Sequence, residues 1–308
     1  MAQAESEPLV FAIVVNWNRC ELALEAVRSL ASSDYPNLKI IVVDNGSTDG
    51  SADAVASEFT NAIIIRNDQN FGFAAGNNIG IERALKEGAG FVFLLNNDAT
   101  VAPDTVRILV NFARNNPRLG GAAPYIFYHQ QTDLIWFGGG TAALWRGRIA
   151  HQWIRQWYRS EQHYCRRTGY LTGCAVLFKA DALHEIGLFD LTYGLYSEDV
   201  DLSLRLRWKG WELWVVPEAH VRHRISVSSH GEFTPLKAYH RGRSNALLVK
   251  RHIRWWQAPT LLIGGLLGGV FVSLRLLMTG RKATVAAFWR GAWMGLTGGR
   301  IPSEFQLQ

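Results

Sequence analysis

Cysteine is scarce in this chain: three of its 308 residues are cysteines, at Cys20, Cys165 and Cys174. Their small, odd number and irregular spacing argue against a disulfide framework, and no histidine or cysteine around them has the spacing of a zinc cluster. We therefore expect the protein to work in a reducing compartment. Residues 1–8 are acidic and polar, so they do not have the pattern of a secretory signal.

Internal repeats are also absent. The sequence has no heptads, no glycine triplets and no repeat with a period of about 20–50 residues, which excludes a coiled coil, collagen and a solenoid. Charged residues make up only 19% of the chain and hydrophobic residues 48%, which excludes wholesale disorder. At roughly 150 residues per domain, the length fits one large domain or two small ones.

Acidic residues are few in the last third of the chain. Residues 204–308 contain 16 Lys and Arg against 4 Asp and Glu, a balance of +12, whereas residues 1–203 contain 16 against 22, a balance of −6. The basic third predicts a polyanionic partner, which is a phosphorylated substrate, a nucleic acid or an anionic membrane surface. A merely solvated basic face is the alternative, but the long apolar runs in the same segment argue against it.

The first 120 residues alternate between strand-like and helix-like segments. Apolar runs typical of buried strands cover residues 9–16, 39–43, 62–66 and 91–95, and helical segments cover residues 18–30, 51–58, 74–86 and 103–114. We expect Asn18 and Glu21 to form a capping box at the start of the first helix. The short loops predict βαβ units, and hence a mostly parallel sheet with helices on both faces and ligands at the carboxyl ends of its strands.

The middle of the chain is less regular. Residues 121–172 are rich in aromatic residues and arginine, and we expect strands and loops there that cover an edge of the sheet. Helices are predicted over residues 179–186 and 198–209, the second with Val200, Leu204 and Trp208 on one face, and a strand over residues 211–216.

A long apolar run, broken only by Arg275, extends from Ala258 to Thr279. Its length is borderline for a membrane span, which needs about 20 such residues. For this run and for residues 283–296 we favour helices that lie in the plane of an anionic membrane leaflet or re-enter it. A membrane span and a buried core helix are the alternatives.

Polar clusters follow the expected strands. Asp98 ends the cluster Asn96-Asn97-Asp98 after a buried strand, where a carboxylate suits a divalent cation bound to a diphosphate, or else caps a helix. Asp44 opens the loop over residues 44–51, where it either accepts a hydrogen bond from a nucleobase imide or forms a plain turn. Residues 70–80 contain three glycines that would let the backbone approach a nucleotide, but they are not a Walker loop.

Two further clusters carry titratable groups. Glu198, Asp199 and Asp201 stand at a helix start, where one of them is a candidate general base. The alternative is that all three only interact favourably with the helix dipole. His220 and His223 follow an expected strand, and a neutral imidazole is a good ligand for a divalent ion, although a single histidine is more often structural.

In their order and spacing, these motifs resemble inverting family-2 glycosyltransferases of the GT-A fold, and among them the rhamnosyltransferase-like group. The resemblance covers roughly residues 9–253 and rests on the stretches AIVVNWN, IIVVDNGSTDGS, NFGFAAGNNIGI, FVFLLNNDA, TGCAVLFKADALHEIGLFD, LYSEDVDLSLRLRWKGWELWVVPEAHVRHRIS and KAYHRGRSNALLVKR. It implies an α/β fold with a mixed, mostly parallel sheet and flanking helices, followed here by apolar or amphipathic helices.

The resemblance also implies a division of the chain. A glycosyltransferase domain is expected over residues 9–253, with a nucleotide-binding half over 9–120 and an acceptor half over 121–253. Residues 1–8 are expected to be a disordered terminus, and residues 254–308 a helical tail that associates with the membrane.

Roles for single residues follow from the same resemblance. Asp199 is the expected catalytic base, and Asp98 with His223 is expected to hold Mg²⁺ or Mn²⁺, His220 being the weaker candidate. Asp44 would recognise the base of a UDP- or dTDP-sugar. The expected donor-binding residues are Asn16, Asp44, Asn70, Gly72, Asn77, Asn96, Asn97 and Asp98, and the expected acceptor-side residues are Gly173 and Glu198. Asn96 departs from the family's Asp-x-Asp motif, because it stands where that motif has its first acid.

The expected function is that of a metal-dependent inverting glycosyltransferase in cell-envelope glycan synthesis. Its donor would be dTDP-L-rhamnose or another nucleotide sugar, and its acceptor a lipid-linked or polysaccharide precursor. The enzyme is expected on the cytoplasmic face of the cell membrane, peripheral or monotopic, on an anionic surface. An inactive scaffold that binds a nucleotide sugar is the alternative, favoured only by Asn96. A nucleic-acid partner is not expected, because the basic tail contains no recognised nucleic-acid module.

Overall fold

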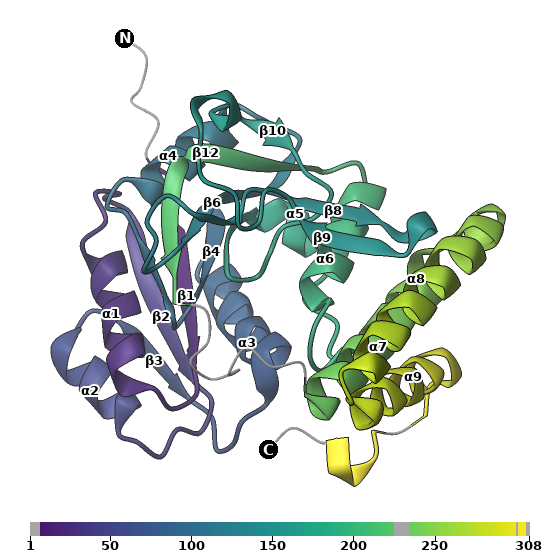
Figure 1. Ribbon diagram of the computed structural model, residues 1–308. Helices are drawn as coiled ribbons and strands as arrows, with labels where there is room; N and C mark the ends of the chain where they lie inside the picture. Colours follow the sequence, from purple (N-terminus) through teal and green to yellow (C-terminus); the bar gives the residue numbers. More distant parts are fainter. Residues whose placement is uncertain (1–6, 225–233, 300, 306–308) are drawn as a thin grey trace.

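A ten-stranded mixed sheet forms the centre of the computed structural model, which describes residues 7–224, 234–299 and 301–305 (Figure 1). Its main path has the order β10-β12-β6-β11-β4-β1-β2-β3, while β5 pairs with β12 and β7 with β6. The strands are β1 (Val10–Asn16), β2 (Leu38–Asp44), β3 (Ile63–Arg66), β4 (Phe91–Asn96), β5 (Ala99–Val101), β6 (Leu119–Tyr128), β7 (Ile135–Phe137), β10 (Arg166–Arg167), β11 (Ala175–Lys179) and β12 (Glu212–His223). Strands β4, β1, β2 and β3 are parallel, and β11 runs antiparallel to both of its neighbours.

The predicted elements of the first 120 residues are confirmed to within two residues at nearly every end. The helices are α1 (Cys20–Ala31), α2 (Ser51–Glu58), α3 (Gly72–Lys86) and α4 (Thr105–Arg114). The predicted capping box is wrong: α1 follows Arg19, which has a left-handed backbone and no capping side chain, and the Asp49 carboxylate accepts a hydrogen bond from the Cys20 amide at 3.0 Å. The Asn18 carboxamide oxygen instead accepts a hydrogen bond from the Thr48 amide, so this residue fixes the neighbouring loop.

Helix α3 packs closely on the sheet because of its glycines. A methyl group at Gly80 would overlap the Ile13 side chain of β1, and one at Gly76 would overlap Val15. These two glycines therefore have a packing role, which sequence alone does not distinguish from a role in approaching a nucleotide. Gly72, with φ +83° and open space around its Cα, begins the helix at the edge of the sheet.

The expectation that residues 121–172 only cover an edge of the sheet is wrong in part. Strand β6 lies in the interior, between β11 and β12, and nine of its ten residues are buried. The rest of the segment does consist of short strands and loops, including the hairpin of β8 (Gly140–Ala143) and β9 (Arg148–His151). Strand β12 is also longer than predicted, because its pairing with β6 resumes at His220 after an irregularity over Pro217.

The C-terminal part is helical, with α5 (Ala180–Ile186), α6 (Glu198–Trp208), α7 (Pro235–His252), α8 (Ala258–Met278) and α9 (Lys282–Thr297). On α6, Val200 and Leu204 are buried, whereas Trp208, at the end of the helix, is 54% exposed. Helix α9 packs tightly on α7, where Gly242 and Gly291 meet the backbone of the opposing helix.

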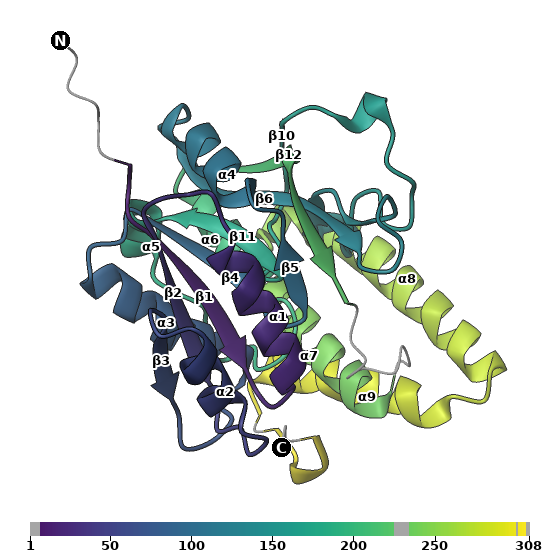
Figure 2. The ribbon, with the colours of Figure 1, turned by 90° about the vertical axis from the view of Figure 1, so that its left-hand side faces the viewer.

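Helix α8 projects from the body of the protein (Figures 1 and 2). The segment Trp255–Met278 is long and apolar enough to cross a membrane, and none of its most apolar stretch is buried within the protein. The buried core helix considered for this segment is therefore wrong. Residues 1–6 of the terminus expected to be disordered, residues 225–226 of the motif that begins at Leu195, and residues 300 and 306–308 of the tail lie outside the described residues.

Candidate active site

Polar side chains join the carboxyl ends of three neighbouring strands. The register pairs Asn16 at the end of β1 with Asp44 at the end of β2, and Val15 with Asn96 of β4. The buried Asn16 carboxamide donates to Ser51 Oγ at 2.8 Å and accepts from the Asn97 carboxamide at 2.7 Å. The structure therefore brings Asn16, Asp44, Asn96 and Asn97 to one edge of the sheet.

Asp44 has an incompletely used carboxylate. The side chain is buried, and its Oδ2 accepts a hydrogen bond from the Ser47 amide at 3.1 Å. Its Oδ1 is buried without a hydrogen-bond partner among the described residues. Because an unpaired buried acceptor is costly, this oxygen is suited to an N–H donor that a ligand supplies.

Asn70 and Gly72 lie beside this edge, whereas Asn77 does not face it. The Asn70 carboxamide oxygen accepts from the Gly72 amide at 2.9 Å, and the Asn45 carboxamide donates to the Gly72 carbonyl at 3.1 Å. Asn77 is 2% exposed and donates to the Phe73 carbonyl within α3. Its side chain thus bonds to its own helix.

Asp98 and His223 meet across two strands. Asp98 lies in the turn between β4 and β5, and β5 pairs with the end of β12, where His223 is the last residue. His223 Nε2 lies 3.1 Å from Asp98 Oδ1, and the side chain is 8% exposed. Burial opposes the charged imidazolium, but the neighbouring Cys174 and Asp98 outweigh it and raise the pKa of His223 to about 10.

The pair resembles part of a metal site. His223 Nδ1 is buried without a hydrogen-bond partner among the described residues. No group of three or more His, Cys, Asp and Glu side chains is placed to hold a metal ion in the part of the chain that the structure describes. His220 is exposed and its ring packs on Phe127, while its carbonyl accepts from Thr105 Oγ1, so its role in the structure is separate from the pair.

Asp199 and Glu198 begin α6 and line a cavity of about 690 Å³. Asn96, Gly173 and His223 line the same cavity, so residues far apart in the sequence converge on one space. The buried Cys174 lines the same cavity: burial raises the pKa of its thiol, the charge of His223 lowers it, and the charges of Asp98 and Asp199 raise it further. All three charges are therefore close to this thiol.

The two carboxylates are held differently. Asp199 Oδ2 accepts from the Gly173 amide at 3.2 Å, and its Oδ1 accepts from the Val200 amide at 2.8 Å. Glu198 is buried, and its Oε2 has no partner among the described residues. Burial raises the pKa of both groups, and together with the charge of Asp199 it brings that of Glu198 to about 8.

The backbone before α6 is strained. Tyr196 and Ser197 both have φ +69°, in the left-handed region that residues other than glycine rarely adopt. Each such residue costs on the order of 1–3 kcal/mol, and such strain gathers at functional sites. Here it aims the start of α6, with its two carboxylates, into the cavity.

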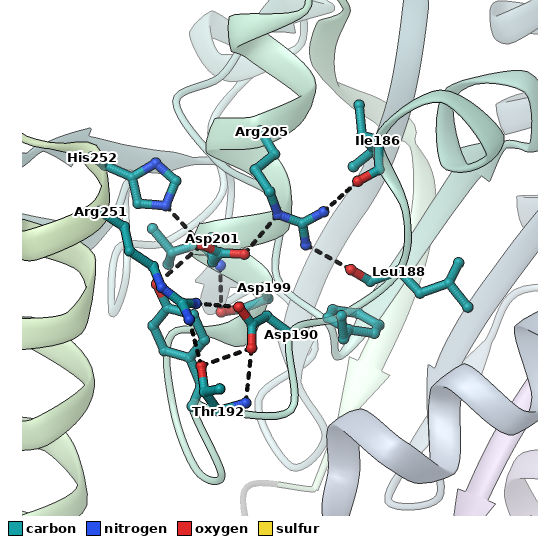
Figure 3. Close-up of polar contacts among 12 residues, drawn as sticks. Ile186, Leu188, Asp190, Thr192, Asp199, Asp201, Arg205, Arg251 and His252 are labelled. Atoms are coloured by element: carbon teal, nitrogen blue, oxygen red, sulfur yellow. Dashed lines mark hydrogen bonds and ion pairs between the residues drawn. The ribbon is translucent and has the colours of Figure 1, made fainter. Parts of the chain in front are cut away.

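Asp201 anchors the other side of the same helix (Figure 3). Its Oδ1 accepts from Tyr193 Oη at 3.0 Å and lies 2.7 Å from His252 Nε2, and its Oδ2 accepts from Arg205 Nε at 2.8 Å. Arg205 also donates to the Ile186 and Leu188 carbonyls. The network ties α6 to the last turn of α7 and to the end of α5, and Asp201 does not line the cavity.

Several cavity residues had no predicted role. Trp136, His151 and Tyr170 come from the middle segment, where the sequence shows no periodic pattern. Arg241 and Asn245 come from α7, inside a stretch whose resemblance to the family is specific. Their spacing of four residues on a helix is the one sequence signal that would have placed them on a common face.

Comparisons with known proteins agree on one family. The model of Glycosyl transferase family 2 matches residues 11–187. The N-acetylglucosaminyl-diphospho-decaprenol L-rhamnosyltransferase of Mycobacterium tuberculosis is 30% identical to this chain over 251 residues, which are 75% of this chain and 81% of that protein. A galactofuranosyltransferase of Mycolicibacterium smegmatis is 25% identical over 228 residues, which are 74% of each chain.

Solved structures share the fold. The mannosyltransferase PcManGT from Pyrobaculum calidifontis, in complex with GDP-Man and Mn²⁺, matches with a TM-score of 0.61 at 17% identity, over 96% of this chain and 89% of that one. GalNAc-T7, with UDP, GalNAc and Mn²⁺, matches with a TM-score of 0.60 at 15% identity, over 81% of this chain and about half, 52%, of that one. The expected GT-A fold, a mixed and mostly parallel sheet flanked by helices, is confirmed.

Proposed function

The chain belongs to glycosyl transferase family 2 and is a glycosyltransferase, and we propose that it transfers L-rhamnose from dTDP-L-rhamnose to a lipid-linked N-acetylglucosamine acceptor. The catalytic part of the proposal rests on one observation: Asp199 lines the cavity that also contains His223, the partner of Asp98. The choice of sugar and acceptor rests on the name of the rhamnosyltransferase relative.

Asp199 is the proposed general base. The amides of Gly173 and Val200 hold its two carboxylate oxygens, so the orientation of the group is fixed before the acceptor binds. Asp199 takes the proton of the acceptor hydroxyl as that oxygen attacks the anomeric carbon of the donor. The bond from the anomeric carbon to the diphosphate breaks on the opposite side, the nucleoside diphosphate leaves, and the configuration inverts.

The edge formed by β1, β2 and β4 is the proposed donor site. The unpaired Oδ1 of Asp44 fits the imide N–H of uracil or thymine, and the linked carboxamides of Asn16 and Asn97 stand beside it. Asn70 and Gly72 extend this edge, whereas we expect Asn77 to act only through the packing of α3.

Asp98 and His223 are the proposed protein ligands of Mg²⁺ or Mn²⁺. Two protein ligands fit such an ion, because Mg²⁺ in nucleotide-binding sites commonly completes its coordination with substrate phosphates and water. His223 holds a proton near neutral pH when no ion is bound, so ion binding would release this proton, and the neutral imidazole and the Asp98 carboxylate would hold the ion. With asparagine at position 96, Asp98 is the acidic ligand of the pair. When bound, the ion would supply positive charge at the leaving diphosphate.

The C-terminal helices are the proposed membrane-associating tail, which begins after α7. Helix α8 exposes its apolar side chains, and Arg254, Arg281 and Lys282 flank it with positive charge. Apolar helices with basic flanks bind anionic leaflets. We place the enzyme on the cytoplasmic face of the cell membrane, where the lipid-linked precursors of envelope glycans would reach Gly173 and Glu198 on the acceptor side of the cavity.

A donor and acceptor screen tests this assignment. The full-length protein in detergent would be mixed with Mg²⁺ or Mn²⁺, N-acetylglucosaminyl-diphospho-farnesol, and dTDP-L-rhamnose, UDP-galactose or GDP-mannose in separate reactions. Mass spectrometry should show the addition of one rhamnose only in the first reaction. A product formed only from UDP-galactose or GDP-mannose would overturn the choice of rhamnose.

A further inference from the structure

Arg241 places an uncompensated positive charge in the active-site cavity. With Asn245 and Val249 it lines the cavity at intervals of four residues, which puts the three side chains on one face of α7. Arg241 is exposed, and no hydrogen bond or ion pair of its side chain occurs within the described residues. The other basic residues that follow it on α7 do have partners: Arg243 donates to the Thr192 carbonyl and Lys250 to the Leu296 carbonyl.

The groups around Arg241 do not balance its charge. Its guanidinium lies close enough to His151, Tyr170 and Tyr196 to influence their ionisation, for which burial is the main factor. Burial lowers the pKa of His151 to about 4 and raises the pKa values of the two tyrosines, so all three are neutral near pH 7. The two carboxylates of the cavity belong to α6 and form no ion pair with Arg241.

The cavity wall continues into helix α8. The turn η1 (Leu144–Arg146) joins β8 to β9, and Leu144, Gly147 and Ile149 of this hairpin line the cavity. A methyl group at Gly147 would lie 3.1 Å from the Gly265 Cα of α8, so hairpin and helix are in close contact. Figure 1 shows the hairpin of β8 and β9 pointing toward α8. An apolar chain that leaves the cavity past the tip of this hairpin, at η1, would therefore contact the exposed apolar surface of α8.

We propose that the cavity and the adjoining face of α8 together bind a prenyl diphosphate. The diphosphate would lie at Arg241 and Asn245, and the prenyl chain would lie along α8. Arginine is suited to phosphate oxygens because its fork donates two parallel, charge-assisted hydrogen bonds. The exposed apolar residues of α8, including Leu262, Leu267 and Phe271, would be covered by the chain and the lipid around it. The inference deepens the proposed function, on which it rests, by naming how the acceptor lipid is held.

Binding of farnesyl diphosphate to the full-length protein in detergent tests the proposal, measured by titration calorimetry. Arg241→Ala should weaken binding at least tenfold, and Arg241→Lys by a smaller factor, while farnesol should bind both variants as it binds the unmodified protein. The matched control is Arg148→Ala. Arg148 is on β9, but it lines a different cavity, on the other face of the strand from Gly147 and Ile149.

Two further ligands distinguish a lipid diphosphate from free diphosphate and from the diphosphate of the sugar donor. Inorganic diphosphate should bind far more weakly than farnesyl diphosphate, and dTDP with Mn²⁺ should bind Arg241→Ala unchanged. If the substitution weakens dTDP instead of farnesyl diphosphate, Arg241 belongs to the donor site and the proposal is wrong. Unchanged affinity for farnesyl diphosphate would also overturn it. Because the experiment measures binding and not sugar transfer, its result can be interpreted even if the assignment of rhamnose is wrong.

Discussion

His252 Nε2 lies 2.7 Å from Asp201 Oδ1, and this contact fixes the last turn of α7 to the helix that carries Asp199. Both side chains are almost completely buried, and Asp201 also accepts hydrogen bonds from Tyr193 and Arg205. Burial alone would raise the pKa of Asp201, but His252 and Arg205 outweigh it and lower the value.

Asp201→Ala should destabilise the protein by about 3–5 kcal/mol, because it leaves the buried His252 and the partly buried Arg205 without their carboxylate partner. Urea unfolding monitored by tryptophan fluorescence would measure this change. The control is Asp53→Ala, which breaks an exposed ion pair with Arg66 and should cost at most about 1 kcal/mol. Equal losses for the two variants would contradict the anchoring role of Asp201.

Asp199→Asn should lower the rate of sugar transfer by about 10²–10⁴-fold, the usual contribution of a general base. Binding of dTDP should not change, because the proposed donor site lies at β1, β2 and β4 and not on α6. Transfer would be followed by mass spectrometry and dTDP binding by calorimetry. Asp181→Asn, on the exposed start of α5, is the control. Normal turnover by the Asp199 variant would remove this residue from the reaction.

The stability of the protein should fall between about pH 4.5 and 8 because of Glu198. Its pKa in the folded protein is about 8, mainly through burial, against an ordinary value of 4.5. In this interval the folded state holds a proton that the unfolded state has released, so the free energy of unfolding decreases as pH rises. Glu198→Gln should flatten this slope in urea melts at pH 5, 7 and 9. Parallel curves for the variant and the parent protein would contradict the shift.

His223→Ala should abolish the increase in melting temperature that Mn²⁺ causes in the presence of dTDP, since a ligand that binds only the folded state stabilises it. His220→Ala is a close control, because this exposed histidine lies three residues earlier on the same strand and packs on Phe127. If the control abolishes the Mn²⁺ effect and His223→Ala does not, the assignment of the metal ligands is reversed.

Substitutions on α8 test membrane association without removing the helix. Leu267 is 65% and Phe271 69% exposed, so Leu267→Glu with Phe271→Glu should leave the fold intact. The doubly substituted protein should float less with vesicles that contain phosphatidylglycerol, because charges oppose burial in the leaflet. Leu191→Glu, an exposed leucine outside α8, should not change flotation. Deletion of the tail is a poorer test, since it would also remove α9 from α7.

Local patterns in the sequence are enough to predict most of the structure of residues 9–120. Strands such as β1 and β4 are continuous apolar runs, and polar residues end them, so their positions and the common edge follow from short-range rules. Strand β6 was misjudged because it begins with Leu119-Gly120-Gly121 and contains Pro124, which resemble a loop. Its burial between β11 and β12 depends on partners distant in the sequence.

The part of the cavity formed by α6 and α7 is less predictable for the same reason. Asp199 was predicted from the family motif, but the link from Asp201 to His252 spans 51 residues and has no local signature. Arg241 becomes informative only when the structure places it in the cavity with Asp199. Helical spacing puts Trp208 on one face with Val200 and Leu204, but it does not show that Trp208 lies on the surface beside the His252 ring.

The glycine contact between α7 and α9 has a mechanical consequence. Gly242 and Gly291 bring the two backbones into direct contact, so we expect the two helices to move as one body. Because Arg241 and His252 belong to α7, binding of the tail to a bilayer, as proposed, would let the bilayer's thickness or curvature tilt this body and shift one wall of the active-site cavity relative to the sheet. The physical state of the lipid would then influence the reaction rate without a regulatory ligand.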